Sequence, residues 1–304
     1  MPTPFIAVEY TIKHNAYMTQ MKTKPNTCLT YKALLLSISI LLHSVLHICT
    51  AEVYQWTDAQ GKQHYSDKSN AQAKPYKLAK SESFHLVKKV YDGDTVLLAD
   101  GRKIRLLGIN TPEVEHRNKT AQVGGDAARK WLTQKILGTK VRLEFDQQKR
   151  DKYKRYLAHI FTEQKVHINA ELVRLGFAST NVFPPNLKYV AALQAAEQVA
   201  ESQYLGIWGY PAYQTKLASE LNNKNRRGWQ RIIGTVTHIK QTRKNTYLEI
   251  STHFNIRIHQ KHRLYFDNAD SLLGKKVEVR GWVHKYKKGY SMPLKHSSAL
   301  KIIN

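Results

Sequence analysis

Two arginines and two acidic residues stand out in this chain because their types and order suit the cleavage of a phosphate ester. Hydrolysis of a phosphodiester places negative charge on the phosphoryl oxygens, so cations must face them and a carboxylate must orient or deprotonate the attacking water. Arg105 and Arg155 can bind a phosphate as guanidinium forks. Glu113 can act as the base, and Asp94 can anchor a metal ion.

These residues belong to short motifs that have ordinary structural interpretations when each is taken alone. YDGDT, at 91–95, is typical of a turn. RLLGINTPE, at 105–113, is typical of a strand that runs into a loop or helix, and DKYKRYLA, at 151–158, of a hairpin tip. A fourth motif, NAELVRLGFA, follows at 169–178. Their joint order favours a functional interpretation more than any one of them does.

In this order the four motifs closely resemble those of the thermonuclease family, the homologues of staphylococcal nuclease. The resemblance covers roughly residues 84–208. It implies an OB-type barrel with three helices and a calcium-dependent nuclease that cleaves the bond between phosphorus and the 5′ oxygen in DNA and RNA. The products would carry a 3′-phosphate, and Ca²⁺ would be the cofactor.

The resemblance also implies three groups of site residues. The catalytic group is Arg105, Glu113 and Arg155. The calcium ligands are Asp94, the side chain of Asn110 and the backbone carbonyl of Thr111. The substrate-binding group is Lys152, Tyr153 and Phe183.

Two positions depart from the family pattern. Asn110 stands where the staphylococcal enzyme has a second metal-binding aspartate, and an amide oxygen can ligate calcium but carries no charge. The site should therefore bind calcium more weakly or accept other divalent cations. In STNVFPPN, at 179–186, Phe183 alone stands for the tyrosines that flank the nucleotide. Phenylalanine can stack on a base but cannot donate a phenolic hydrogen bond, so the base preference is open.

Two other functions are compatible with these residues. One is a non-catalytic protein whose OB-type barrel holds nucleic acid or an anionic wall polymer, although such a protein has no need of a carboxylate such as Glu113 facing a phosphate. The other is a nuclease that needs no calcium, with the arginines alone meeting the phosphate charge. Asp94 and its neighbour Asp92 argue against this alternative, whereas Asn110 favours it.

Apolar alternation and turn residues predict the elements that must position the site. From Phe84 onward, strands are predicted at 85–91, 95–98, 103–109, 140–145 and 157–161. Helices are predicted at 125–136, 168–175 and 187–204, the last two ending at glycines. Five strands with a helix after the third are typical of a small OB-type barrel closed at one end by helices. The predicted domain, residues 84–210, is thus mainly β with added helices, an α+β fold.

Other segments flank this barrel. Residues 52–70 predict two short strands, at 53–57 and 63–66, and resemble a small module of unknown function that follows the signal peptide of exported proteobacterial proteins. Residues 71–83 are polar and lysine-rich and are interpreted as a linker. Residues 226–304 predict a β-rich module that would form a second OB-like barrel.

The charge of the chain favours a polyanionic partner, with DNA or RNA as the substrate. Lysine and arginine exceed aspartate and glutamate by 25. Residues 226–304 hold 17 basic and 4 acidic residues, against 20 and 13 in residues 84–210. The C-terminal module should therefore raise the affinity for nucleic acid.

The first 51 residues are typical of a signal peptide. Lysines precede an apolar run at 33–46, and small residues before a cut after Ala51 complete the pattern, with Met21 as an alternative start. The protein is therefore predicted to be exported to the periplasm or the medium, with no stable membrane partner after cleavage. An uncleaved membrane anchor is the alternative. Both cysteines, Cys28 and Cys49, precede the cut, so the mature chain would contain no disulfide.

Overall fold

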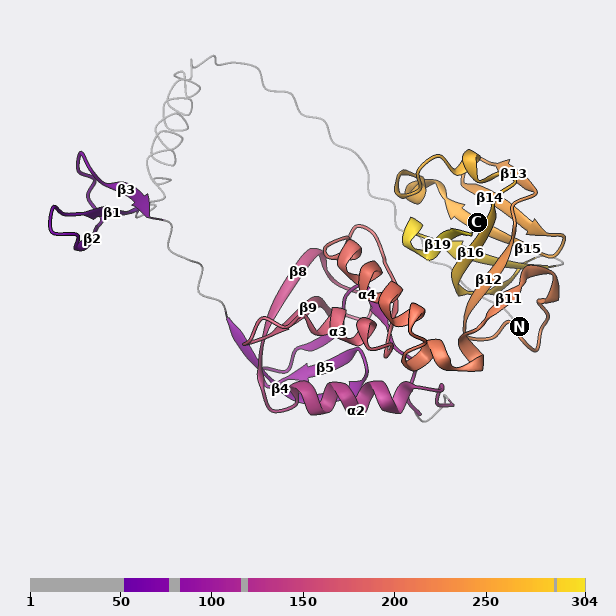
Figure 1. Cartoon of the computed structure of the whole chain (residues 1–304), viewed down its shortest axis with the longest axis horizontal. Helices are drawn as coiled ribbons and strands as arrows, with labels where there is room; N and C mark the ends of the chain where they lie inside the picture. The colour runs from indigo at the N-terminus through magenta and orange to yellow at the C-terminus, as the bar shows by residue number, and fades with distance from the viewer. Residues whose placement is uncertain (1–51, 77–82, 116–119, 287–288, 304) are drawn as a thin grey trace, which may run out of the picture. The chain divides into compact units, whose positions relative to one another are not determined.

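The computed structural model describes residues 52–76, 83–115, 120–286 and 289–303. The predicted signal peptide, at 1–51, lies outside the described residues. The chain divides into two compact units, with the boundary between Lys80 and Ser81 (Figure 1). None of the described helices is long and apolar enough to cross a membrane.

The N-terminal unit contains a small antiparallel sheet of order β2-β1-β3. Its first two strands, β1 (Val53–Thr57) and β2 (Gln63–Ser66), confirm the prediction. The third strand, β3 (Lys74–Tyr76), pairs with β1 and lies in the segment that the sequence indicated as a linker. The Tyr65 and Tyr76 rings contact each other edge to face with centroids 5.0 Å apart. The sheet therefore extends to Tyr76, and the linker interpretation of residues 74–76 was wrong.

The second unit begins with a closed barrel of strand order β4-β5-β6-β9-β8, as predicted. Its strands are β4 (Phe84–Asp92), β5 (Thr95–Leu98), β6 (Lys103–Leu106), β8 (Lys140–Arg150) and β9 (Tyr156–Thr162). All neighbours are antiparallel except β6 and β9, which are parallel. The helices that accompany the barrel are α2 (Gly125–Ile136), α3 (Ile168–Arg174) and α4 (Val190–Ser202).

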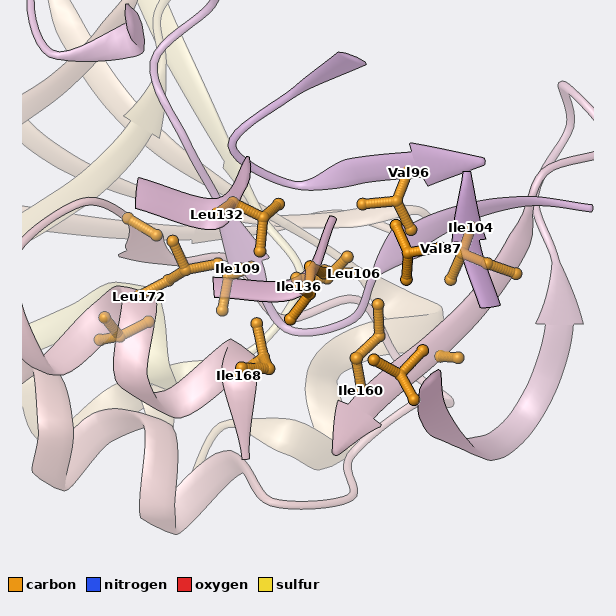
Figure 2. Packing of buried hydrophobic residues seen from close by; sticks show 14 of the residues in the cluster. Val87, Val96, Ile104, Leu106, Ile109, Leu132, Ile136, Ile160, Ile168 and Leu172 are labelled. Carbon is orange, nitrogen blue, oxygen red and sulfur yellow. The ribbon is translucent and has the colours of Figure 1, made fainter. Parts of the chain in front are cut away.

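The barrel core forms because alternate strand residues and one face of each helix are apolar. Val96, Ile104 and Leu106 from the strands are almost fully buried, together with Leu132 from α2 and Leu172 from α3 (Figure 2). Each such side chain contributes roughly 1.5–3 kcal/mol of burial free energy. The core fixes the ends of β5, β6 and β9, from which the site residues project.

The predicted strand at 103–109 is interrupted within the motif RLLGINTPE. β6 ends at Leu106, and the chain resumes as β7 (Ile109–Asn110), which pairs with β10 (Ser179–Thr180) outside the barrel. Gly108 makes the turn with φ of +74°, and a Cβ atom there would collide with Leu193 of α4. The prediction of one continuous strand was therefore wrong at this point. The turn carries Asn110 out of the barrel and into contact with a different sheet partner.

The C-terminal module is β-rich, as predicted, and has two hydrogen-bonded sheets around one core rather than a single closed ring of strands. The four-stranded sheet consists of β11 (Thr215–Leu217), β12 (Trp229–Thr235), β16 (Lys276–Trp282) and β19 (Leu300–Ile303). The five-stranded sheet consists of β13 (His238–Gln241), β14 (Asn245–Ser251), β15 (Phe254–His259), β18 (Gly289–Leu294) and β17 (His284–Tyr286). Because β11 pairs with β12, the module begins before residue 226.

A buried network of charges joins the C-terminal module to helix α4. Its members are Arg231 on β12, Glu278 and Arg280 on β16, and Glu197 and Glu201 on α4. Arg280 lies 2.9 Å from Glu197 and 2.7 Å from Glu201, and Arg231 lies 2.8 Å from Glu278. The guanidinium groups of Arg231 and Arg280 also lie 5.2 and 5.3 Å from the centroid of the buried Trp208 ring. The barrel and the module are thus held together by contacts that neither could satisfy alone.

Candidate active site

Seven of the nine predicted site residues line two cavities, and the other two, Asp94 and Thr111, line neither. The first, here called the phosphate cavity, has a volume of about 490 Å³. Its lining includes the predicted residues Arg105, Lys152, Tyr153, Arg155 and Phe183. The second, here called the Glu113 cavity, has a volume of about 300 Å³, and its lining includes Asn110 and Glu113. The two cavities are linked where Arg105 Nη2 donates a 3.4 Å hydrogen bond to Asn110 Oδ1.

Asp94 ties together the segments that bear these residues. The carboxylate is buried at the start of β5. Its Oδ2 accepts hydrogen bonds from the amide and the hydroxyl of Thr111 at 3.0 and 3.1 Å and lies 2.9 Å from Arg105 Nη2. Oδ1 accepts a hydrogen bond from the Thr95 hydroxyl at 3.0 Å. One carboxylate therefore positions both a predicted catalytic arginine and a predicted metal ligand.

Asp92 forms a second carboxylate beside Asp94. Asp92 Oδ1 accepts a hydrogen bond from the Asp94 amide at 3.0 Å. Burial, followed by repulsion from the Asp94 carboxylate, raises the pKa of Asp92 to about 6. A cation bound between the two groups would relieve this repulsion. Asp92 was predicted only as a neighbour of Asp94, and the spacing Asp-Gly-Asp at 92–94 is the sequence signal for a carboxylate pair.

The predicted metal ligands are in mutual contact. Besides the bonds between Asp94 and Thr111, Asn110 Nδ2 donates to the Thr111 carbonyl at 3.1 Å. Carboxylate, amide and carbonyl oxygens are the donors that calcium prefers. Within the described ranges, no three His, Cys, Asp or Glu side chains are grouped so that they could hold a metal ion. The types of donor fit a hard divalent cation, but two of the three ligands, Asn110 and the Thr111 carbonyl, would be uncharged.

Glu113 lies in the loop between β7 and α2, and its backbone is fixed from two sides. The Glu113 amide donates to Gln122 Oε1 at 3.0 Å, and its carbonyl accepts from the Gln122 amide at 2.8 Å. Gly125 lies so close that a Cβ atom there would come within 2.5 Å of the Glu113 carbonyl oxygen. The first turn of α2 thus supports the backbone from which the Glu113 side chain reaches its cavity.

Arg155 is positioned by Asp151, the first residue of the motif DKYKRYLA. Asp151 Oδ1 accepts hydrogen bonds from the amides of Tyr153 and Arg155 at 2.9 and 3.0 Å, which closes the turn. Its Oδ2 accepts from Arg155 Nε at 2.7 Å and lies 2.7 Å from Nη2. Sequence analysis gave Asp151 no role. An aspartate four residues before an arginine in a hairpin tip was the signal available for it.

Tyr153 and Phe183 are aromatic side chains that remain accessible at the phosphate cavity. Tyr153 is 67% exposed, and its ring centroid lies 4.9 Å from Lys152 Nζ. Phe183 is 44% exposed and follows β10. Asn186 attaches the loop after Phe183 to β8, because its side chain exchanges hydrogen bonds of 2.7 and 2.9 Å with the backbone of Gln148. Both rings are therefore placed to stack on bases.

The C-terminal module also contributes to both cavities, which sequence analysis did not predict at residue level. Lys261, His262 and Lys295 line the phosphate cavity. Trp229 and Trp282 line the Glu113 cavity. The sequence signal was only the excess of basic residues in this module, which does not indicate which of them face the site.

Comparison with known proteins shows which families parts of the chain resemble. The model of the staphylococcal nuclease homologue family matches residues 103–210, and that of a domain of unknown function, DUF4124, matches residues 47–83. The thermonuclease of Staphylococcus intermedius is 36% identical over 127 residues, covering 41% of this chain and 75% of that protein. The thermonuclease of Staphylococcus hyicus is 32% identical over 131 residues, with 42% and 77% covered. Endonuclease YncB of Bacillus subtilis is 35% identical over 132 residues, with 42% and 62% covered.

Proposed function

Because the chain belongs to the staphylococcal nuclease family and is therefore a nuclease that hydrolyses phosphodiester bonds, we propose that it is a calcium-dependent enzyme with Glu113 as its general base. Arg105 and Arg155 stabilise the charge of the phosphate. The observation that carries this proposal is that the two arginines share the phosphate cavity, while Glu113 lies in the cavity next to it.

The two arginines are oriented before substrate arrives. The carboxylate of Asp94 holds the guanidinium of Arg105, and the carboxylate of Asp151 holds that of Arg155. Preorganised donors of this kind stabilise the developing phosphoryl charge without having to reorganise during the reaction. Asp94 and Asp151 are thus positioning residues, whereas the arginines contact the phosphate.

Glu113 accepts a proton from the attacking water as its oxygen bonds to phosphorus. The bond between phosphorus and the 5′ oxygen breaks, its electron pair leaves with that oxygen, and the oxygen takes a proton from solvent water, which gives a 3′-phosphate on one product and a 5′-hydroxyl on the other. Asp94, Asn110 and the Thr111 carbonyl would hold Ca²⁺, which, when bound, supplies positive charge to the phosphoryl oxygens. The uncharged Asn110 side chain should make this site tolerant of other divalent cations.

DNA, and RNA as a second substrate, fit the basic composition of the chain. The apolar run at 33–46 supports export, so the working enzyme would act in the periplasm or the medium without a stable membrane partner. The basic residues of the C-terminal module would raise the affinity for the polyanion.

Replacing Glu113 tests the proposed base. Wild-type protein and Glu113→Gln are incubated with single-stranded DNA, duplex DNA and RNA, in calcium, in magnesium and in chelator. We expect cleavage by wild type with calcium, and a loss of about 10²-fold or more in kcat for the variant. Glu115→Gln, on the same loop, is the matched control and should cleave as wild type does. Equal cleavage by wild type and Glu113→Gln would remove Glu113 from the mechanism.

The rival function has its own outcome in the same experiment. A wild-type protein that binds all three nucleic acids without cutting any would be a binding protein with an OB-type barrel. Cleavage that persists in chelator would instead indicate a nuclease in which the arginines alone meet the phosphate charge.

A further inference from the structure

We propose that the C-terminal module completes the substrate groove of the nuclease barrel, with Trp282 as a stacking surface for a base and Lys261 and Lys295 as phosphate contacts. This inference rests on the proposed function. It adds a substrate subsite built from residues beyond 210, where the match to the nuclease family ends.

Trp282 is the residue that connects the two parts of the groove. It ends β16, is 36% exposed, and lines the Glu113 cavity together with Asn110 and Glu113. The same side chain lines a further cavity of about 680 Å³, which it shares with Tyr153 and Phe183. One indole ring therefore reaches from the proposed base to the aromatic rings proposed to flank the nucleotide.

The position of Trp282 is fixed by its strand. Trp282 is paired in register with Trp229 of β12, and the five residues that precede it in β16 are buried. β16 also carries Arg280, which is ion-paired with α4 of the barrel. Exposure of a large aromatic ring on a rigid strand, next to a cavity, is typical of a binding surface. Bases of any type can stack on such a ring.

Lys261 and Lys295 place positive charge beside the proposed catalytic arginines. Both line the phosphate cavity with Arg105 and Arg155, and Lys295 Nζ lies 4.0 Å from the centroid of the Phe183 ring. Burial, followed by repulsion from Lys261 and Lys152, lowers the pKa of Lys295. Cations crowded in this way are stabilised when a polyanion binds among them.

The basic lining continues away from the reacting phosphate. Lys261 and Lys295 also line a cavity of about 290 Å³ together with Lys244 and Arg257. Lys244 immediately precedes β14, and Arg257 lies on β15 of the five-stranded sheet. A nucleic-acid strand that leaves the phosphate cavity therefore meets further cations on the C-terminal module. A short oligonucleotide in the catalytic cavities would meet only the module residues that line them, whereas a longer one would also reach Lys244 and Arg257.

The test compares substrates of two lengths. Trp282→Ala, Trp282→Phe and Lys261→Ala/Lys295→Ala are assayed with oligothymidylates of about 4 and about 20 nucleotides, lengths that bracket typical single-strand sites. Lys276→Ala/Lys301→Ala removes two exposed lysines from the four-stranded sheet and is the charge-matched control. Circular dichroism and urea unfolding establish that each variant is folded.

For the long substrate we expect KM to rise by about 5- to 150-fold in Trp282→Ala, the range of one lost stacking contact, with kcat retained. Trp282→Phe should recover most of this loss. In the double lysine variant, the slope of log affinity against log salt should fall by about 1.4, or about 0.7 for each lost phosphate contact. The short substrate should show a change in the same direction, because Trp282, Lys261 and Lys295 line the catalytic cavities, and the control variant should behave as wild type.

Two results would overturn the inference: an unchanged KM for the long substrate in Trp282→Ala, or an unchanged salt slope in the double lysine variant. Binding of the long oligonucleotide to Glu113→Gln and to its Trp282→Ala derivative, measured by fluorescence anisotropy, needs no cleavage. A failure of the proposed mechanism can therefore be distinguished from a failure of the proposed groove.

Discussion

Asn110 is the single side chain that most affects the charge of the proposed calcium site. Its amide oxygen accepts a hydrogen bond from Arg105, and its amide nitrogen donates to the Thr111 carbonyl. The side chain thus bridges a proposed catalytic residue and a proposed ligand, but adds no negative charge beside Asp94. The calcium affinity should depend on this difference.

Asn110→Asp should lower the calcium concentration that gives half-maximal activity, because it adds a carboxylate to a site whose donors are mostly uncharged. Calcium titration of activity and isothermal calorimetry would measure the change. Asn181→Asp adds the same charge to the lining of the phosphate cavity and is the control. If both variants shift the titration equally, Asn110 acts through charge alone and is not a ligand.

The site roles of residues within one motif could be predicted from the sequence. The roles of residues that reach the site through contacts between distant segments could not. Arg105 and Glu113 lie eight positions apart, so their motif indicated them together. The role of Asp151 in positioning Arg155 could not be predicted, because an aspartate in a hairpin tip is common. Its hydrogen bonds to Arg155 depend on the geometry of the turn. Trp282 reaches the Glu113 cavity only because β16 packs near it, a contact that no local pattern encodes.

At the level of elements, β9 and the start of α3 are joined by two histidines. His159 of β9 is buried, and its Nδ1 lies 3.1 Å from Nε2 of His167, which immediately precedes α3. Burial is the largest cause that lowers the pKa of His159 to about 3 and that of His167 to about 4. The charged groups that also influence the pair are Glu144 and Asp146 on β8 and Lys188 before α4.

This pair should make the fold less stable in acid. Below about pH 6.5 the unfolded chain binds protons at both histidines while the folded chain does not, so acidification to about pH 4 favours unfolding. The free energy of unfolding should fall by up to about 1.4 kcal/mol per pH unit for each histidine. Urea unfolding of wild type and His167→Gln between pH 7 and 4 should show a shallower fall for the variant. Parallel curves would mean that His167 is protonated in the folded protein.

The elements themselves were largely predictable because apolar periodicity determines them. α2 was predicted with its observed bounds, whereas the strand at 103–109 was predicted as continuous. At the interruption, the backbone of Gly108 leaves no room for a Cβ atom beside Leu193 of α4, which lies 85 positions further along the chain. Local sequence shows the glycine but not the residue that it must accommodate.

At the scale of the whole molecule, the buried ion pairs between α4 and the C-terminal module join the barrel and the module. Burial opposes ionisation of Glu278, but hydrogen bonds and charge from Arg231 and Arg280 outweigh it and lower the pKa of its carboxyl group. Glu197, which pairs with Arg280, also accepts hydrogen bonds from the amide and the hydroxyl of Thr180 in β10. Removing the module at Arg226 would leave Glu197 and Glu201 of α4 without their arginine partners.

Arg280→Met should destabilise the protein by about 3–5 kcal/mol, the scale for removing one partner of a buried ion pair. Urea unfolding followed by tryptophan fluorescence would report the change, since Trp208 packs against Arg280. Arg174→Met removes a surface pair with Glu171 and should cost less than about 1 kcal/mol. Equal unfolding midpoints for wild type and Arg280→Met would show that the network contributes little to stability.

The sequence predicted the order of segments along the chain but not how the last segment packs. The excess of basic residues beyond 226 indicated a separate polyanion-binding module. Arg231 and Arg280 belong to that excess, yet they are buried against acidic residues of α4 rather than available to a ligand. A count of charges cannot distinguish these two uses of arginine.

The position of Trp282 and Lys295 late in the chain has a consequence for biosynthesis. A ribosome completes Arg105, Glu113 and Arg155 long before it reaches residue 282, so a nascent or prematurely terminated chain has the proposed catalytic residues without the module that is proposed to complete the groove. We expect such a chain to be a weaker nuclease on long nucleic acids than the finished protein. The enzyme would then reach its full affinity for long nucleic acids only when its synthesis is complete.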